Sequence, residues 1–127
     1  MSERWGREVR AIIASRPGVM QESLRAALTN LSWIEVTGSA GDGLSALGLV
    51  RDQQPDLLVV DSNLLEDETL TLLRQVKQQW PVIRCLVLAQ TTRQRAWALA
   101  VGADCVLSRN DPSQRLSEAL GQIRLAH

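Results

Sequence analysis

Polar residues that could do chemistry follow three short apolar runs of this 127-residue sequence. Asp61 stands directly after the most hydrophobic run, Ser15 and Arg16 follow the first run, and Arg109 comes just after the last. A guanidinium presents a flat fork of donors that matches a carboxylate. We therefore hypothesise that Arg16, or Arg16 together with Arg109, pairs with Asp61. The alternative for Arg16 is a side chain that points from a loop into solvent.

Composition excludes several other kinds of site. The single histidine, His127, is the last residue, which leaves little room for catalysis or metal binding built on histidine. Cys85 and Cys105 lie within apolar runs, so two buried reduced thiols are a better interpretation than a disulfide. Lys plus Arg and Asp plus Glu both number 14, and this balance gives no electrostatic signature of nucleic-acid or membrane binding.

The N-terminus and the lengths of the apolar runs indicate the expected cellular location. No apolar run approaches the length of a bilayer span, and Met1 to Arg10 does not have the pattern of a signal peptide. We therefore expect a cytoplasmic protein without membrane contact.

Apolar runs alternate with segments of helical periodicity. The predicted strands are Val9–Ala14, Ile34–Thr37, Leu57–Val60, Cys85–Leu88 and Cys105–Leu107. The predicted helices are Met20–Leu31, a helix capped by Asp42 that runs to about Gln53, one that begins near Glu66 and ends before Pro81, Gln94–Val101, and a last one opened by Asp111 and Pro112. Residues 38–41 are expected to form a turn.

This order predicts an α/β fold in which a strand and a helix repeat five times. Continuously apolar strands indicate a parallel sheet buried on both faces, so we expect a (βα)5 doubly wound fold. Residues 9–127 would form this domain, and residues 1–8 an N-terminal extension. Such folds place their sites at the carboxyl ends of the strands. The residues expected there are Ser15, Arg16, Asp61, Ala89, Gln90, Ser108 and Arg109.

Three segments resemble response-regulator receiver domains. PDLLVVDSNL (55–64) is similar to their phosphoacceptor strand, AVGADCVLSR (100–109) to the stretch around their fifth strand, and VRAIIASRPGVMQESLRAAL (9–28) to their first strand and helix. Among receivers, these segments most resemble those of NarL/LuxR-class transcriptional regulators. The resemblance implies a CheY-like, flavodoxin-like sheet with strand order 2-1-3-4-5, a role in two-component signalling, and Asp61 at the phosphoacceptor position.

The same resemblance shows where this sequence departs from the family. Ser15 and Arg16 replace two acidic residues that help to hold Mg²⁺ in receivers. Ala89 replaces a Ser or Thr, Arg109 replaces a Lys, and Val106 replaces the aromatic residue that moves during switching. Asn63 could still offer its backbone carbonyl to a metal. Loss at five functional positions together implies a degenerate pseudo-receiver.

Acyl-phosphate formation needs a carboxylate nucleophile and a metal that bridges it to the phosphoryl group. Mg²⁺ prefers octahedral oxygen coordination and usually takes one or two carboxylates. Asp61 would be the only carboxylate here, with a guanidinium near it that repels a divalent ion. We therefore expect no Mg²⁺ site, no other cofactor and no enzymatic activity.

Trp97 is the candidate for partner binding. The resemblance places it on the fourth helix, on a face that receivers use for partners or dimerisation, where an exposed Trp could act as an anchor. The alternative is a ring folded down over the helix as a hydrophobic lid. The apolar run around Trp97 does not decide between the two, because its periodicity gives no orientation.

Three functions are therefore compared. The preferred one is a receiver that acts through contacts with a protein partner, an attached output domain or a second copy, independently of Asp61 phosphorylation and without direct nucleic-acid binding. The resemblance to NarL/LuxR-class receivers would fit the N-terminal part of a transcriptional regulator. The alternatives are a conventional phosphoacceptor with an unusual Mg²⁺ site and a sensor of a small ligand in the strand-end crevice.

Overall fold

The structure is a computed structural model that describes residues 8–110 and 113–125. Strands and helices alternate along the chain as the sequence predicts. Their order is β1 (Val9–Ala14), α1 (Val19–Thr29), β2 (Ile34–Ala40), α2 (Gly43–Gln53), β3 (Leu57–Asp61), α3 (Glu66–Gln79), β4 (Arg84–Ala89), α4 (Thr92–Ala100), β5 (Cys105–Ser108) and α5 (Ser113–Leu125). The expected start of the last helix at Asp111 and Pro112, and residues 1–7 of the expected extension, lie outside the described residues.

All strand pairs are parallel, and the sheet has the order β2-β1-β3-β4-β5. This confirms the (βα)5 doubly wound fold with strand order 2-1-3-4-5. Because all strands are parallel, the carboxyl ends of β1, β3, β4 and β5 lie at the same edge of the sheet. The strand order reverses between β1 and β3, which is where such folds form their sites. That edge carries the candidate site.

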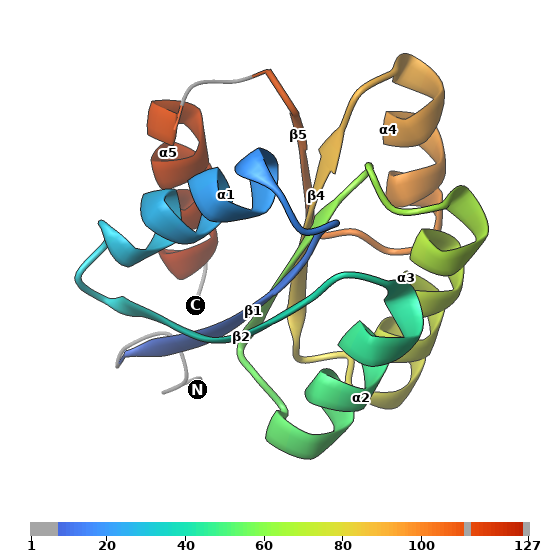
Figure 1. Cartoon of the computed structure of the whole chain (residues 1–127), viewed down its shortest axis with the longest axis horizontal. Coiled ribbons are helices and arrows are strands. Elements are labelled where there is room, and N and C mark those ends of the chain that lie inside the picture. Colours follow the sequence, from blue (N-terminus) through green and yellow to red (C-terminus); the bar gives the residue numbers. More distant parts are fainter. Residues whose placement is uncertain (1–7, 111–112, 126–127) are drawn as a thin grey trace.

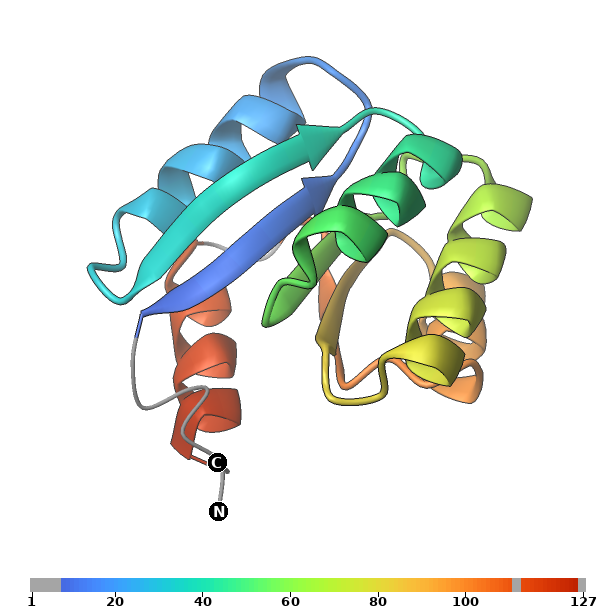
Figure 2. The ribbon, with the colours of Figure 1, turned by 90° about the horizontal axis from the view of Figure 1, so that it is seen from below.

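The sheet separates two hydrophobic cores, and the helices divide between its faces (Figure 1; Figure 2). Helices α1 and α5 cover one face, and α2, α3 and α4 cover the other. Each strand contributes side chains to both cores, because successive side chains of a strand point to opposite faces of the sheet. On β1, for example, Ile12 belongs to the α2–α4 side, and Ala11 and Ile13 belong to the α1–α5 side.

The same alternation separates the two cysteines. Cys85 of β4 is fully buried on the α2–α4 side, whereas Cys105 of β5 packs against the core on the α1–α5 side. Both thiols are free. This agrees with the preference for reduced cysteines, since side chains on opposite faces of a sheet cannot reach one another.

Several element boundaries differ from the sequence-based prediction by one or two residues, and the end of β2 differs by three. β2 continues to Ala40, so the expected turn at 38–41 was wrong: the β1–β2 register shifts between Ala11 and Ile12, and this irregularity lets the strand continue through Gly38. α4 begins at Thr92 rather than Gln94. The Thr91 hydroxyl accepts a hydrogen bond from the Gln94 backbone N–H at 3.1 Å, and the Gln94 side chain accepts one from the Thr91 N–H at 3.2 Å.

The expected N-cap of α2 is confirmed. Oδ1 of Asp42 accepts a hydrogen bond from the backbone N–H of Ser45 at 2.7 Å, and this bond is the main reason that the pKa of Asp42 lies below its ordinary value. No helix in the described ranges is long and apolar enough to cross a membrane.

Candidate functional site

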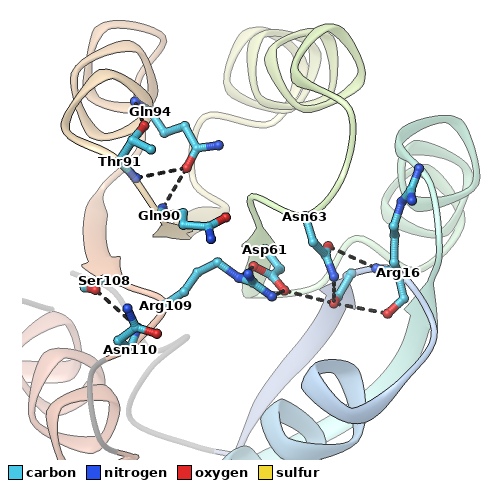
Figure 3. A network of polar contacts seen from close by, with 10 residues as sticks. Arg16, Asp61, Asn63, Gln90, Thr91, Gln94, Ser108, Arg109 and Asn110 are labelled. Atoms are coloured by element: carbon cyan, nitrogen blue, oxygen red, sulfur yellow. Dashed lines mark hydrogen bonds and ion pairs between the residues drawn. The ribbon is translucent and has the colours of Figure 1, made fainter.

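Asp61 is the last residue of β3, and its side chain has no exposed surface. Its backbone pairs with Leu88 of β4, and the next residue, Ser62, donates its N–H to the Leu88 carbonyl at 2.9 Å. The central strand of the sheet therefore delivers a carboxylate to the edge where the loops meet (Figure 3). A buried carboxylate has to be compensated by charge or hydrogen bonds.

Arg109 supplies that compensation. Its Nε donates to Oδ1 of Asp61 at 2.6 Å and its Nη2 donates to Oδ2 at 3.2 Å, which is a bidentate pair (Figure 3). The Arg109 side chain is 20% exposed. Its backbone N–H donates to the Ala89 carbonyl at 2.9 Å, so the end of the β4–β5 ladder positions the guanidinium. The hypothesis of an arginine–carboxylate pair therefore agrees with the geometry for Arg109.

Ser15 and Asn63 complete the surroundings of the carboxylate. The Ser15 hydroxyl is fully buried and donates to Oδ2 of Asp61 at 3.3 Å. Nδ2 of Asn63 donates to the Ser15 oxygen at 3.3 Å, and Oδ1 of Asn63 accepts the backbone N–H of Arg16 at 3.1 Å. The loop after β1 is thus tied to the loop after β3 by neutral groups.

Arg16 does not pair with Asp61, and this part of the hypothesis was wrong. Its side chain is exposed and turns away from the carboxylate (Figure 3). The reason is the path of the backbone after β1. Successive side chains of an extended segment point in opposite directions, so once Ser15 faces Asp61, Arg16 faces outward. The alternative of a solvent-facing Arg16 is the correct one.

The two switch positions contain only apolar side chains. Ala89 and Val106 are 5% and 6% exposed and belong to the core on the α2–α4 side. Ala89 and Leu107, the neighbour of Val106, line a cavity of about 220 Å³ that reaches from the β4–α4 loop to β5. Arg95 of α4 closes this region by donating from Nη1 to the Val106 carbonyl at 3.3 Å. Neither residue could donate a hydrogen bond from its side chain towards Asp61.

Trp97 adopts the lid arrangement. Its ring is partly buried and packs against the core on the α2–α4 side, and its Nε1 is buried without a hydrogen-bond partner in the described part of the chain. An exposed anchor is therefore the wrong description of this side chain. The large apolar side chain that α4 does expose is Leu99, at 51%.

The donors around Asp61 do not fit a magnesium ion. Both carboxylate oxygens already accept hydrogen bonds from Arg109. The other side-chain oxygens of this network, the Ser15 hydroxyl and Oδ1 of Asn63, are neutral, and each accepts a hydrogen bond from the other's loop. Residues 8–110 and 113–125 contain no group of three or more His, Cys, Asp or Glu that could hold a metal. A divalent ion would have to displace a guanidinium to reach one carboxylate.

The side chain of Asn63 is the participant that sequence reasoning missed. Only its backbone carbonyl was expected to take part, whereas in the structure Nδ2 of its amide bonds to Ser15 and Oδ1 bonds to Arg16. Gln21 adds a bond from Nε2 to the Ser15 carbonyl at 2.7 Å. The available signal was position: Asn63 follows Asp61 by two residues in a short loop, where amide side chains commonly bond to nearby backbone.

Comparison with known proteins places this geometry in a family. Residues 12–121 match the response regulator receiver domain. The chain is 34% identical over 106 residues to a protein-glutamate methylesterase/protein-glutamine glutaminase of Anaeromyxobacter dehalogenans, covering 81% of this chain and 29% of that protein. It is 29% identical over 86 residues to the uncharacterized transcriptional regulatory protein YhcZ of Bacillus subtilis, covering 68% of this chain and 40% of YhcZ.

Solved structures agree on the fold. The receiver domain of the response regulator NarL from Mycobacterium tuberculosis superposes with a TM-score of 0.84 at 20% identity, over 95% of this chain and 99% of that domain. A LuxR-family response regulator from Aurantimonas gives 0.85 at 20% identity, over 94% and 87%. The chain spans 29% and 40% of the length of the two curated relatives described above. The sequence match, the sheet order and the position of Asp61 together establish that this chain belongs to the response regulator receiver domain family.

Proposed function

We propose that this receiver domain signals through protein contacts and does not depend on phosphorylation of Asp61. The observation that carries the proposal is the bidentate Arg109–Asp61 pair in a site where the carboxylate is fully buried. A nucleophilic carboxylate needs an accessible oxygen and a metal that bridges it to the phosphoryl group. Both Asp61 oxygens are engaged, and the positions that would add acidic metal ligands hold Ser15 and the outward-facing Arg16.

The pair also supports a fixed conformation. Arg109 ties the end of β5 to the end of β3, and the apolar Ala89 and Val106 fill the positions through which a phosphoryl group would be sensed. We infer that Mg²⁺ does not bind with useful affinity at neutral pH. The domain would then present one surface constantly to its partner.

The partner is proposed to be a protein, an attached output domain or a second copy of the domain. The relatives carry much additional chain, and YhcZ is named as a transcriptional regulatory protein. An output domain that acts on transcription therefore fits this receiver, which would itself contact no nucleic acid. The cytoplasm is the proposed location, where Cys85 and Cys105 would remain reduced.

The test is incubation with Mg²⁺ and acetyl phosphate, followed by intact-mass analysis. We expect the mass of the parent protein to remain unchanged. An added phosphoryl group that Asp61→Asn abolishes would overturn the proposal and establish a conventional phosphoacceptor with an unusual site.

A matched gain-of-function variant makes a negative result informative. Combining Ser15→Asp, Arg16→Asp, Ala89→Thr and Arg109→Lys restores the residue types that family receivers use. This variant is expected to gain a phosphoryl group under the same conditions, which shows that the phosphodonor and the detection work on this chain.

A further inference from the structure

A second feature of the strand-end edge is a cavity of about 400 Å³ between α1, α5 and the ends of β4 and β5. Its walls are mainly apolar, and the buried side chains Leu24, Leu88, Leu107 and Leu116 contribute to them. Its polar lining includes Ser23 and Arg109. This size and lining lie at the small end of ligand-binding pockets, which are largely apolar with a few placed polar groups.

Arg109 belongs to both this cavity and the Asp61 pair. Its Nε and Nη2 bond to Asp61, which leaves Nη1 without a bond to any of the described residues. A guanidinium carries five N–H donors in one plane, so a single Arg can serve two carboxylates. The cavity therefore combines apolar walls with a cation that retains donor capacity.

We propose that this cavity binds a small amphipathic carboxylate. The apolar body of the ligand lies against the leucines of α1, β4, β5 and α5, and its carboxylate bonds to Arg109. A neutral molecule of the same shape would gain the apolar contacts but not the charge-assisted hydrogen bond. A cation would be repelled by Arg109.

Binding at this position would act on the Asp61 site. The carboxylate of the ligand would share the positive charge of the Arg109 guanidinium with Asp61, so an occupied cavity weakens the tie between β5 and β3. The ligand would thus change the conformation of the strand-end loops without phosphate or Mg²⁺. This consequence rests on the proposed function, in which the Arg109–Asp61 pair fixes the signalling state, whereas binding itself does not.

The test uses octanoate and octanol, which share an alkyl chain and differ in charge. Each is titrated into the protein labelled with ¹³C at the leucine methyl groups, and chemical shifts are followed by NMR. We expect saturable shifts at Leu24, Leu88, Leu107 and Leu116, with octanoate binding about tenfold more tightly than octanol. Equal affinity for the two compounds, or shifts confined to exposed Leu44 and Leu65, would overturn the proposal.

Two neighbouring alanines of α1 provide a matched pair of variants. Ala27 lines the cavity, whereas Ala26 is exposed and does not. Ala27→Phe should fill the space and reduce octanoate affinity at least about tenfold, while Ala26→Phe should leave it unchanged. Equal affinity of the two variants would place the ligand elsewhere and overturn the proposal.

Arg109→Gln tests the polar contact. It should abolish the preference for octanoate over octanol while octanol still binds, and a preference that persists would contradict the role of Arg109. The binding experiments contain no phosphodonor, and the phosphorylation experiment contains no octanoate. Failure of one inference is therefore distinguishable from failure of the other.

Discussion

Asp61 and Arg109 show how an arginine changes the chemistry at a position where the resemblance to receivers implies a lysine. A lysine is a compact point charge on a flexible stem, whereas an arginine offers a rigid fork. In this protein the fork takes both oxygens of a carboxylate that has no contact with solvent. Removing one member of a buried pair leaves the other uncompensated, which costs far more than the pair itself contributes.

Arg109→Met should therefore destabilise the domain by about 3 kcal/mol, because Asp61 would remain buried and unpaired. Urea denaturation monitored by circular dichroism measures the change. Arg16→Met is the control and should change stability by less than about 0.5 kcal/mol, since the Arg16 side chain is exposed. Asp61→Asn combined with Arg109→Met should recover much of the loss. Equal effects of the two single arginine variants would contradict the pairing described here.

Cys85 gives a second residue-scale prediction, in the alkaline range. Burial raises the pKa of its thiol from 9.0 to about 12. Between these values the unfolded chain loses the thiol proton while the folded chain keeps it, so stability falls as pH rises above 9.0 and is unaffected below it. One pH unit above 9.0, the loss should reach about 1.4 kcal/mol.

The measurement compares the pH dependence of urea denaturation in the parent and in Cys85→Val, which keeps a small apolar side chain in the core. Other titrating groups are shared, so the difference between the two curves isolates Cys85. Parallel curves from neutral pH to about pH 10 would show that the thiol is not shielded as the structure indicates.

At the scale of elements, two glycines of α2 face different surroundings. A Cβ on Gly43 would lie 2.9 Å from the backbone oxygen of Glu68, so α2 and α3 approach more closely there than a larger residue allows. A Cβ on Gly48 would have only an arginine side-chain nitrogen nearby, at 3.7 Å. Helix propensity favours alanine over glycine in the helix interior.

Gly48→Ala, in the helix interior, should therefore stabilise the domain by about 0.5–1 kcal/mol, whereas Gly43→Ala, at the first position of the helix, should lower its melting temperature because the added methyl group meets the backbone of Glu68. Thermal melts of the two variants provide the measurement, and each serves as the control for the other. A rise in melting temperature for both would mean that the α2–α3 contact adapts without cost.

The elements were largely predictable because their signals are local. Continuous apolar strands indicated burial on both faces, and Asp42 marked the start of a helix through ordinary capping chemistry. β2 was extended by a register shift relative to β1, and such pairing irregularities depend on the partner strand. The sequence of β2 alone carries no sign of it.

The site was only half predictable for a related reason. The strand-end rule and the family resemblance placed Asp61, Ser15, Arg16 and Arg109 at one edge, and the structure confirms that edge. Which arginine reaches Asp61 depends on side-chain direction after β1 and β5, and that follows from backbone path rather than from residue type. The orientation of Trp97 was undetermined for the same reason, because an all-apolar helical run has no polar face to orient it.

Across the whole molecule, different polar networks stabilise the two edges of the sheet at which the strands begin and end. At the edge opposite Asp61, the carboxylate of Asp104 pairs with Lys77 at 2.9 Å and Arg84 at 3.2 Å and accepts the Cys85 N–H at 2.8 Å. This network joins α3, β4 and the loop before β5. Arg109 joins β5 to β3 at the other edge. The outer strand β5 is thus fixed at both ends without any phosphoryl group.

If the strand-end loops are fixed in this way, Mg²⁺ should not change the thermal stability of the domain. The melting temperature tests this expectation for the whole domain. A ligand that binds only the folded state stabilises it by RT ln(1 + [L]/Kd), about 1.4 kcal/mol at tenfold its Kd. We expect no rise in melting temperature for the parent up to millimolar Mg²⁺ at neutral pH, because Arg109 occupies both oxygens of Asp61. Ser15→Asp combined with Arg109→Lys adds a carboxylate beside Asp61 and removes the bidentate guanidinium, so this variant should show a concentration-dependent rise. A rise of the same size in the parent would mean that the ion displaces the guanidinium, and the Arg109–Asp61 pair would then be a resting state that the metal opens.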